Sequence, residues 1–133
     1  MRARSFERLK EDCILLDASD MAAILGVTKQ ALSKKLKAGH VIAYANSRRT
    51  YFPEFQLANG KIKPEIKKLL EALGIGPADG SHMNLLIKFL VMPMDFSNID
   101  ELPNIQPRHA LIENSAAFEI IVRDFKNRLN SGK

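Results

Sequence analysis

The segment from Asp17 to Gly39 carries two sets of helix start and stop signals, separated by one short turn. Asp17 and Thr28 are residue types that often accept a hydrogen bond at a helix N-terminus. Gly26 and Gly39 can adopt the positive φ with which many helices end. These signals predict two short helices, one ending at Gly26 and the other at Gly39. Two helices joined by a glycine-containing turn are typical of a helix-turn-helix.

The second helix is predicted to have an apolar side and a cationic side. At 100° per residue, Leu32 and Leu36 lie within about 40° of each other. Between Val27 and Arg49 there are six Lys or Arg residues and no carboxylate. A merely solvated helix face is the alternative, but such a face usually includes Glu for i,i+4 pairing. We therefore predict that this face binds DNA, because Lys, Gln and Ser can contact phosphates and base edges. The predicted contacts are Thr28, Lys29, Gln30, Ser33, Lys34 and Lys37.

Residues 41–52 predict a β-hairpin directly after the second helix. Apolar residues on both sides of Asn46-Ser47 favour two strands joined by a turn, and Pro53 closes the second strand. A hairpin in this place is the wing of a winged helix-turn-helix, and its tip would bring Arg48 and Arg49 to the DNA backbone or minor groove. The alternative is a plain hairpin whose arginines keep a sheet edge soluble. Core packing, rather than base stacking, is expected of Tyr44, Tyr51 and Phe52.

The excess positive charge belongs to the N-terminal part of the chain. Residues 1–50 hold ten Lys or Arg against five Asp or Glu, whereas residues 51–133 hold ten against ten. A basic half joined to a neutral half suggests a polyanion-binding module followed by a second module. We predict a mainly α fold with a small β-hairpin. Its N-terminal winged helix-turn-helix domain spans residues 1–58, and a small helical dimerisation or partner domain spans residues 59–133.

The second predicted domain is mostly helical. Pro64 opens one helix, and an apolar helix ends before Pro93. Gly74 to Gly80 is expected to be a linker, and residues 94–106 a loop. A short helix should begin at Pro107, and the last helix should run from about Ala116 to Leu129. Its apolar stripe has two compatible roles, core packing and a partner surface. The predicted partner or dimer interface consists of Phe89, Phe118, Ile121, Val122 and Phe125.

The residues that could carry chemistry argue against an enzyme. Cys13 is the single cysteine, which excludes an internal disulfide and fits a reducing cytoplasm. The three histidines are far apart in the sequence, and none has metal-ligand spacing. The sequence contains no nucleophile elbow or P-loop, and no apolar run approaches the roughly 20 residues that span a bilayer. We expect a cytoplasmic protein with no catalytic residues, cofactor or metal.

The run from Leu15 to Gly39 resembles the helix-turn-helix of the Xre/MbcA/ParS-type antitoxins. The likeness continues through Tyr51-Phe-Pro-Glu-Phe-Gln56 and Gly60-Lys-Ile-Lys-Pro64. It extends more loosely through Leu90 to Pro93 and through Gln106-Pro107 with Ala110-Leu111, so it covers about residues 14–125. The resemblance implies a dimeric antitoxin that binds its own operator. It also implies a C-terminal domain that plugs the active site of an NAD-consuming RES-domain toxin.

Three function classes follow from the sequence. The first is a sequence-specific DNA-binding transcription regulator that acts as an autoregulating antitoxin. We expect this regulator to be a homodimer. It would place the second helix of each copy in successive major grooves of an inverted repeat in double-stranded DNA. The second is a stand-alone regulator without a toxin, and the third is a general nucleic-acid-binding protein.

Overall fold

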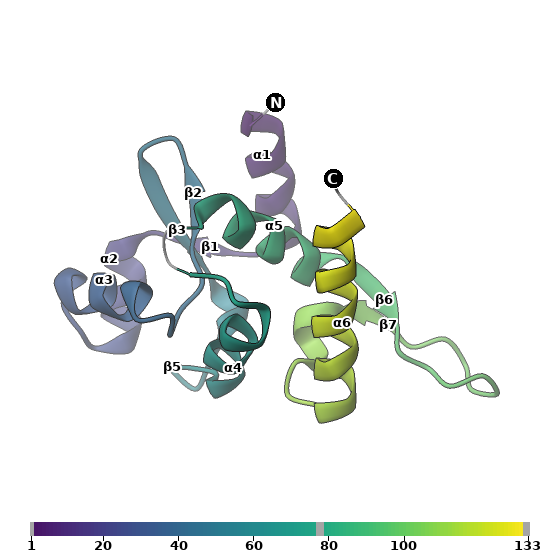
Figure 1. Ribbon diagram of the computed structural model, residues 1–133. Coiled ribbons are helices and arrows are strands. Elements are labelled where there is room, and N and C mark those ends of the chain that lie inside the picture. Colours follow the sequence, from purple (N-terminus) through teal and green to yellow (C-terminus); the bar gives the residue numbers. More distant parts are fainter. Residues whose placement is uncertain (1, 77–78, 132–133) are drawn as a thin grey trace.

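The computed structural model describes residues 2–76 and 79–131, and over these residues the chain is mostly helical with small antiparallel sheets (Figure 1). At this level, the predicted mainly α fold is confirmed. The helices are α1 (Arg2–Asp12), α2 (Ala18–Leu25), α3 (Lys29–Lys37), α4 (Pro64–Leu73), α5 (Gly80–Val91) and α6 (Ser115–Ser131). The strands are β1 (Leu15–Leu16), β2 (Tyr44–Asn46), β3 (Arg49–Pro53), β4 (Leu57–Ala58), β5 (Lys61–Ile62), β6 (Pro93–Asp95) and β7 (Ile105–Pro107). Two 3-10 helices complete the described part of the chain, η1 (Glu54–Gln56) and η2 (Arg108–Leu111).

The boundaries of α2 and α3 follow from the capping residues. The Asp20 N–H donates to Asp17 Oδ1 at 2.8 Å, and the Ala31 N–H donates to Thr28 Oγ1 at 3.0 Å. Each bond satisfies an N–H near a helix start that has no partner within the helix. Gly26 ends α2 with φ 69°, a left-handed conformation that costs glycine little. The predicted helix limits are therefore confirmed here.

A three-stranded antiparallel sheet in the order β1–β3–β2 contains the predicted hairpin. Asn46 pairs with Arg49, so the turn consists of Ser47 and Arg48. This is one residue later than the predicted Asn46-Ser47 turn, because Asn46 still belongs to β2. The strand β3 ends at Pro53, as predicted.

One hydrophobic core runs through both halves of the chain. In the contacts among described residues, α5 lies along β2 while α6 packs against α4 and η2. The core is therefore continuous across residues 58 and 59, between which the charge distribution predicts a domain boundary. Side chains from both halves share it, including Phe6, Met21, Leu32, Ile42, Phe52, Ile66, Leu69, Leu86, Phe89, Ile121 and Phe125.

Gln56 joins the hairpin region to this core through buried polar contacts. Its Oε1 accepts from the Ile42 N–H at 2.9 Å, and its Nε2 donates to the carbonyls of Ile42 at 2.9 Å and Pro53 at 3.0 Å. The residue is fully buried, so these bonds replace the water contacts that its amide loses on folding. Gln56 thereby fixes the entry to β2 against the end of β3.

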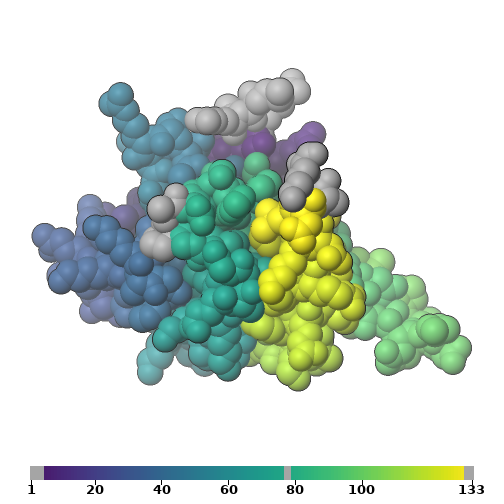
Figure 2. All heavy atoms as spheres, in the orientation of Figure 1, coloured from purple at the N-terminus to yellow at the C-terminus, as the bar shows by residue number. Residues whose placement is uncertain are grey.

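Residues 94–106 are not the loop predicted from the sequence. Strands β6 and β7 pair antiparallel, with Met94 opposite Gln106, and form a β6–β7 arm that comprises residues 93–107. The arm projects from the molecule on the side opposite α2 and α3 (Figures 1 and 2). Three-residue strands show no hydrophobic period, so pattern reading could not find them.

The remaining expected elements differ from the structure mainly at their ends. The predicted short helix that begins at Pro107 is a 3-10 helix over Arg108–Leu111. Gly74 ends α4 with φ 67°, which agrees with a connection beginning there. Residues 77–78 of the predicted linker lie outside the described residues.

Candidate functional site

Helix α3 is held against α2 by its apolar side. Leu32 is buried with a 1% exposed fraction, and Met21 and Ala22 of α2 are buried as well. Leu36 and Val27 also pack against the core. Because these contacts fix one side of α3, its other side faces solvent.

The predicted contact residues on α3 are all exposed. Among the described residues, no ion pair within 4.0 Å joins a carboxylate to any of the four lysines of this helix. Lys35, which flanks the apolar stripe, is half-buried. The exposed set consists of Thr28, Lys29, Gln30, Ser33, Lys34 and Lys37. We call this set the α3 face.

The β2–β3 hairpin adds two further cations on the same side of the molecule. Arg48 lies in its turn and Arg49 begins β3, and both are exposed. The hairpin stands out from the body in the space-filling view (Figure 2). Figure 1 shows it on the side of the molecule that carries α2 and α3, away from the arm. Helix α3 and the hairpin that carries the two arginines therefore lie in the same half of the molecule, away from the arm.

Aromatic packing anchors the hairpin to the N-terminal helix. Phe6 of α1 lies 4.9 Å from Tyr51 and 6.0 Å from Tyr44 between ring centroids. Tyr44 and Phe52 are buried, and Tyr51 is half-buried. The prediction that these aromatic residues pack the hairpin onto the core is confirmed.

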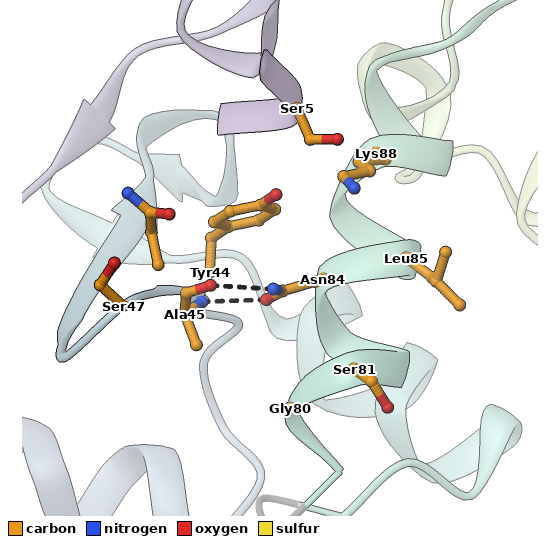
Figure 3. A pocket seen from close by; sticks show the side chains of 10 residues that line it. Ser5, Tyr44, Ala45, Ser47, Gly80, Ser81, Asn84, Leu85 and Lys88 are labelled. Atoms are coloured by element: carbon orange, nitrogen blue, oxygen red, sulfur yellow. Dashed lines mark hydrogen bonds between the residues drawn. The ribbon is translucent and has the colours of Figure 1, made fainter. Parts of the chain in front are cut away.

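A side-chain clasp from α5 fixes the outer strand of the hairpin (Figure 3). Asn84 Oδ1 accepts from the Ala45 N–H at 2.9 Å, and Asn84 Nδ2 donates to the Ala45 carbonyl at 2.9 Å. The pair satisfies both polar backbone groups of Ala45 on β2, which is the edge strand of its sheet. Beside it lies a hollow of about 610 Å³, in which the Lys88 Nζ is 5.8 Å from the Tyr44 ring centroid.

Sequence reasoning missed both Asn84 and one cation. Asn84 bonds to a residue 39 positions away, so no local pattern could indicate its role. Lys67 on α4 is exposed and lines the same hollow as Lys37, together with Glu71. Lys67 lies on the exposed side of α4 and adds a cation beyond α3.

The residues predicted as a partner interface lie mostly inside the chain. Phe89, Ile121 and Phe125 are buried, and the rings of Phe89 and Phe125 lie 5.2 Å apart. As folded here, these three side chains offer no surface to a partner, and their core role is what the structure shows. Only Phe118 and Val122 are partly exposed. The helical stripe identified burial correctly but could not say which molecule covers it.

The single thiol has a raised pKa. Burial, and secondarily the charge of Asp12, raise the pKa of Cys13 to about 11. The thiol is thus protonated at neutral pH and is a weak nucleophile.

Neither a metal cluster nor a membrane span is found in residues 2–76 and 79–131. No three His, Cys, Asp or Glu side chains there lie close enough together to hold a metal ion. Within the same ranges, no helix is long and apolar enough to cross a bilayer.

Comparison with known proteins shows a fold likeness. No protein-family model matches the chain, and no curated protein matches it. Among solved structures, the chain is similar to the NMR structure of Rv2175c, with a TM-score of 0.61 and 18% sequence identity. The match covers 86% of this chain and 80% of that chain. At this identity, the likeness concerns the fold alone.

Proposed function

We propose that the protein is a sequence-specific regulator of transcription that binds double-stranded DNA through the α3 face. The observation that carries the proposal is a helix that presents exposed Lys, Gln and Ser side chains and no carboxylate. The phosphate backbone of DNA is the partner that best fits such a face. Lysine side chains that bind its phosphates release the counterions condensed on the DNA, and this release favours binding. In this proposal, the β2–β3 hairpin is the wing of a winged helix-turn-helix.

The dimensions of α3 suit the major groove of DNA. With its side chains an α-helix is about 10–12 Å in diameter, which fits a groove about 12 Å wide, and the nine residues of α3 make a helix about 14 Å long. Lys34 and Lys37 would contact phosphates, and Gln30 would address a base edge. Arg48 and Arg49 would reach the adjacent backbone or minor groove with their forked donors.

Specific recognition is proposed to involve a homodimer on an inverted repeat. A dimer would place its two α3 helices in major grooves about one helical turn apart, which on B-DNA is about 34 Å. A two-fold symmetric protein then requires a two-fold symmetric operator.

The first test is binding of the full chain to a duplex selected from a random-sequence library. We expect Lys34→Ala and Lys37→Ala each to weaken binding to every duplex and to reduce the slope of log affinity against log salt by about 1. Lys126→Ala is the matched control, because Lys126 is an exposed lysine on α6, outside the α3 face. Equal affinities and slopes for all three variants would exclude α3 as the contact surface.

Gln30→Ala tests the base-reading role in the same assay. The selected duplex should lose about 1–3 kcal/mol of binding free energy, and the preference at one base position should relax. A uniform loss across selected and scrambled duplexes would assign Gln30 to the backbone instead. A general nucleic-acid binder would bind a single strand and an arbitrary duplex as tightly as the selected duplex.

The narrower proposal is an autoregulating antitoxin, supported by the sequence resemblance to the Xre/MbcA/ParS-type family. It requires one thing that a stand-alone regulator does not, a RES-domain toxin encoded beside the gene. Expression of that toxin alone should arrest growth, and co-expression with the full chain should yield a stable complex and restore growth. If no such neighbour exists, the stand-alone regulator is the form of the proposal that remains.

A further inference from the structure

The β6–β7 arm exposes an unusual amount of apolar surface. Ile99, Leu102 and Ile105 are 100%, 87% and 65% exposed, the three highest values among the exposed large hydrophobic side chains of the described residues. Clustered apolar side chains on a projecting element are typical of an interaction surface. Contact with a partner at the arm would thus remove this apolar surface from water.

Hydrogen bonds within the arm give it a defined shape. Asp95 Oδ1 accepts from the backbone N–H groups of Ser97 at 2.9 Å and Asn104 at 3.0 Å. Near the tip, Glu101 Oε1 accepts from the Asn98 N–H at 2.9 Å. An arm ordered before binding loses less conformational entropy when it docks.

A hollow lined by two arginines lies at the base of the arm. It measures about 560 Å³ and is lined by Phe89, Arg108, Asp124, Asn127 and Arg128, and we call it the arginine pocket. The guanidinium carbons of Arg108 and Arg128 lie 4.2 and 5.1 Å from the Phe89 ring centroid. Within the described residues, the buried Nε of Arg108 has no hydrogen-bond partner, while its Nη1 donates to the Met92 carbonyl at 3.1 Å.

The arm and the arginine pocket are complementary in charge and polarity. No Lys or Arg occurs between Lys88 and Arg108, whereas Asp95, Asp100 and Glu101 are acidic. The pocket holds two guanidinium groups against the carboxylate of Asp124, beside an aromatic ring. The acidic tip of the arm therefore fits the cationic hollow.

We propose that two copies of this chain form a dimer by exchanging their β6–β7 arms. Met92 and Arg108 flank the arm directly, so the arginine pocket lies at its base. A two-fold axis across two antiparallel arms brings the tip of each arm to the base of the other. Leu102 then meets the arginine pocket of the other copy, and the carboxylate of Asp100 meets the partner's Arg128. This inference rests on the homodimer of the proposed function and gives it an interface, which forms without DNA.

Sedimentation equilibrium of the full chain without DNA tests the exchange. The wild-type chain should be a dimer, and the double variant Ile99→Ser with Leu102→Ser should raise the dissociation constant about tenfold or more. Ile14→Ser is the matched control, because Ile14 is 59% exposed and lies outside the arm. The control should sediment like the wild type, and so should Lys34→Ala. A monomeric wild type, or a dimer indifferent to the arm substitutions, would overturn the proposal.

Charge reversal tests the pairing of tip and pocket. Asp100→Arg and Arg128→Glu should each weaken the dimer, and the chain carrying both should dimerise again because the pair is restored with opposite signs. Far-UV circular dichroism verifies that each variant is folded. Failure of the doubly reversed chain to recover would overturn the assignment of the pocket. Loss of DNA binding by Lys34→Ala in an intact dimer keeps the two proposals separable.

Discussion

His109 lies face to face with Phe55, with ring centroids 4.2 Å apart and ring planes 5° apart. Burial, followed by the positive charge of Lys63, lowers the pKa of His109 from 6.5 to about 4. A proton on this imidazole would lose much of its hydration and would lie near another cation. The folded chain therefore keeps His109 neutral at physiological pH.

The free energy of unfolding should consequently decrease as the pH is lowered from about 6.5 to about 4. In this range His109 takes up a proton in the unfolded chain but not in the folded chain, so acid favours the unfolded state. The full pKa shift corresponds to about 3 kcal/mol, and partial solvent exposure reduces the expected loss to about 1–2 kcal/mol. The midpoints of urea unfolding, measured across this pH range, check the expected loss of stability. His109→Phe keeps a stacked ring and should lose this part of the pH dependence; the same dependence in both chains would rule out His109 as its source.

At the scale of elements, α5 and the β2–β3 hairpin behave as one unit. The Asn84 clasp holds the Ala45 backbone, and the Ala43 N–H lies 3.3 Å from the Met83 sulfur. These contacts link an element from the middle of the chain to the strand that precedes Arg48 and Arg49. Residues of α5, which lies outside the N-terminal segment, thereby fix the orientation of the hairpin.

Replacing the clasp should loosen the hairpin. Asn84→Leu keeps a similar volume but removes both bonds, so we expect amide exchange at Ala45 to accelerate about tenfold. If the hairpin is a DNA-contacting wing, affinity for the selected duplex should fall several-fold as well. Leu85→Ala is the control, because Leu85 is a neighbour on α5 with no hydrogen bond to the hairpin. Unchanged exchange at Ala45 would show that the pairing of β2 with β3 suffices to hold it.

The whole molecule is organised around one shared core. The N-terminal segment contributes Leu32 and Phe52, and the C-terminal segment contributes Leu86 and Phe125. The predicted boundary between residues 58 and 59 therefore reflects the distribution of charge, whereas the hydrophobic core contains side chains from both sides of that boundary. A fragment that ends at residue 58 would expose apolar surface normally covered by α5.

Unfolding of the full chain in urea should accordingly be one cooperative transition. Circular dichroism and tyrosine fluorescence should give coincident curves, because a continuous core is lost as a unit. A fragment of residues 1–58 should show no cooperative transition. Two separate transitions, or a stably folded fragment, would instead support two independent domains.

The short-range features of this protein follow from local patterns of residues. Helix limits at Asp17, Gly26, Thr28 and Pro64 could be predicted because caps act within three or four residues. The exposed side of α3 could be predicted in the same way, since a helix turns by a fixed angle per residue. Burial of Ile121 and Phe125 also followed from their spacing.

The contacts between elements, in contrast, became visible only in the folded chain. Phe89, Ile121 and Phe125 could have faced a partner or the chain's own core, because a stripe does not specify what covers it. The clasp on Ala45 and the pairing of β6 with β7 join residues that are distant along the chain. Such contacts depend on the packing of the whole core, so no local pattern of residues encodes them.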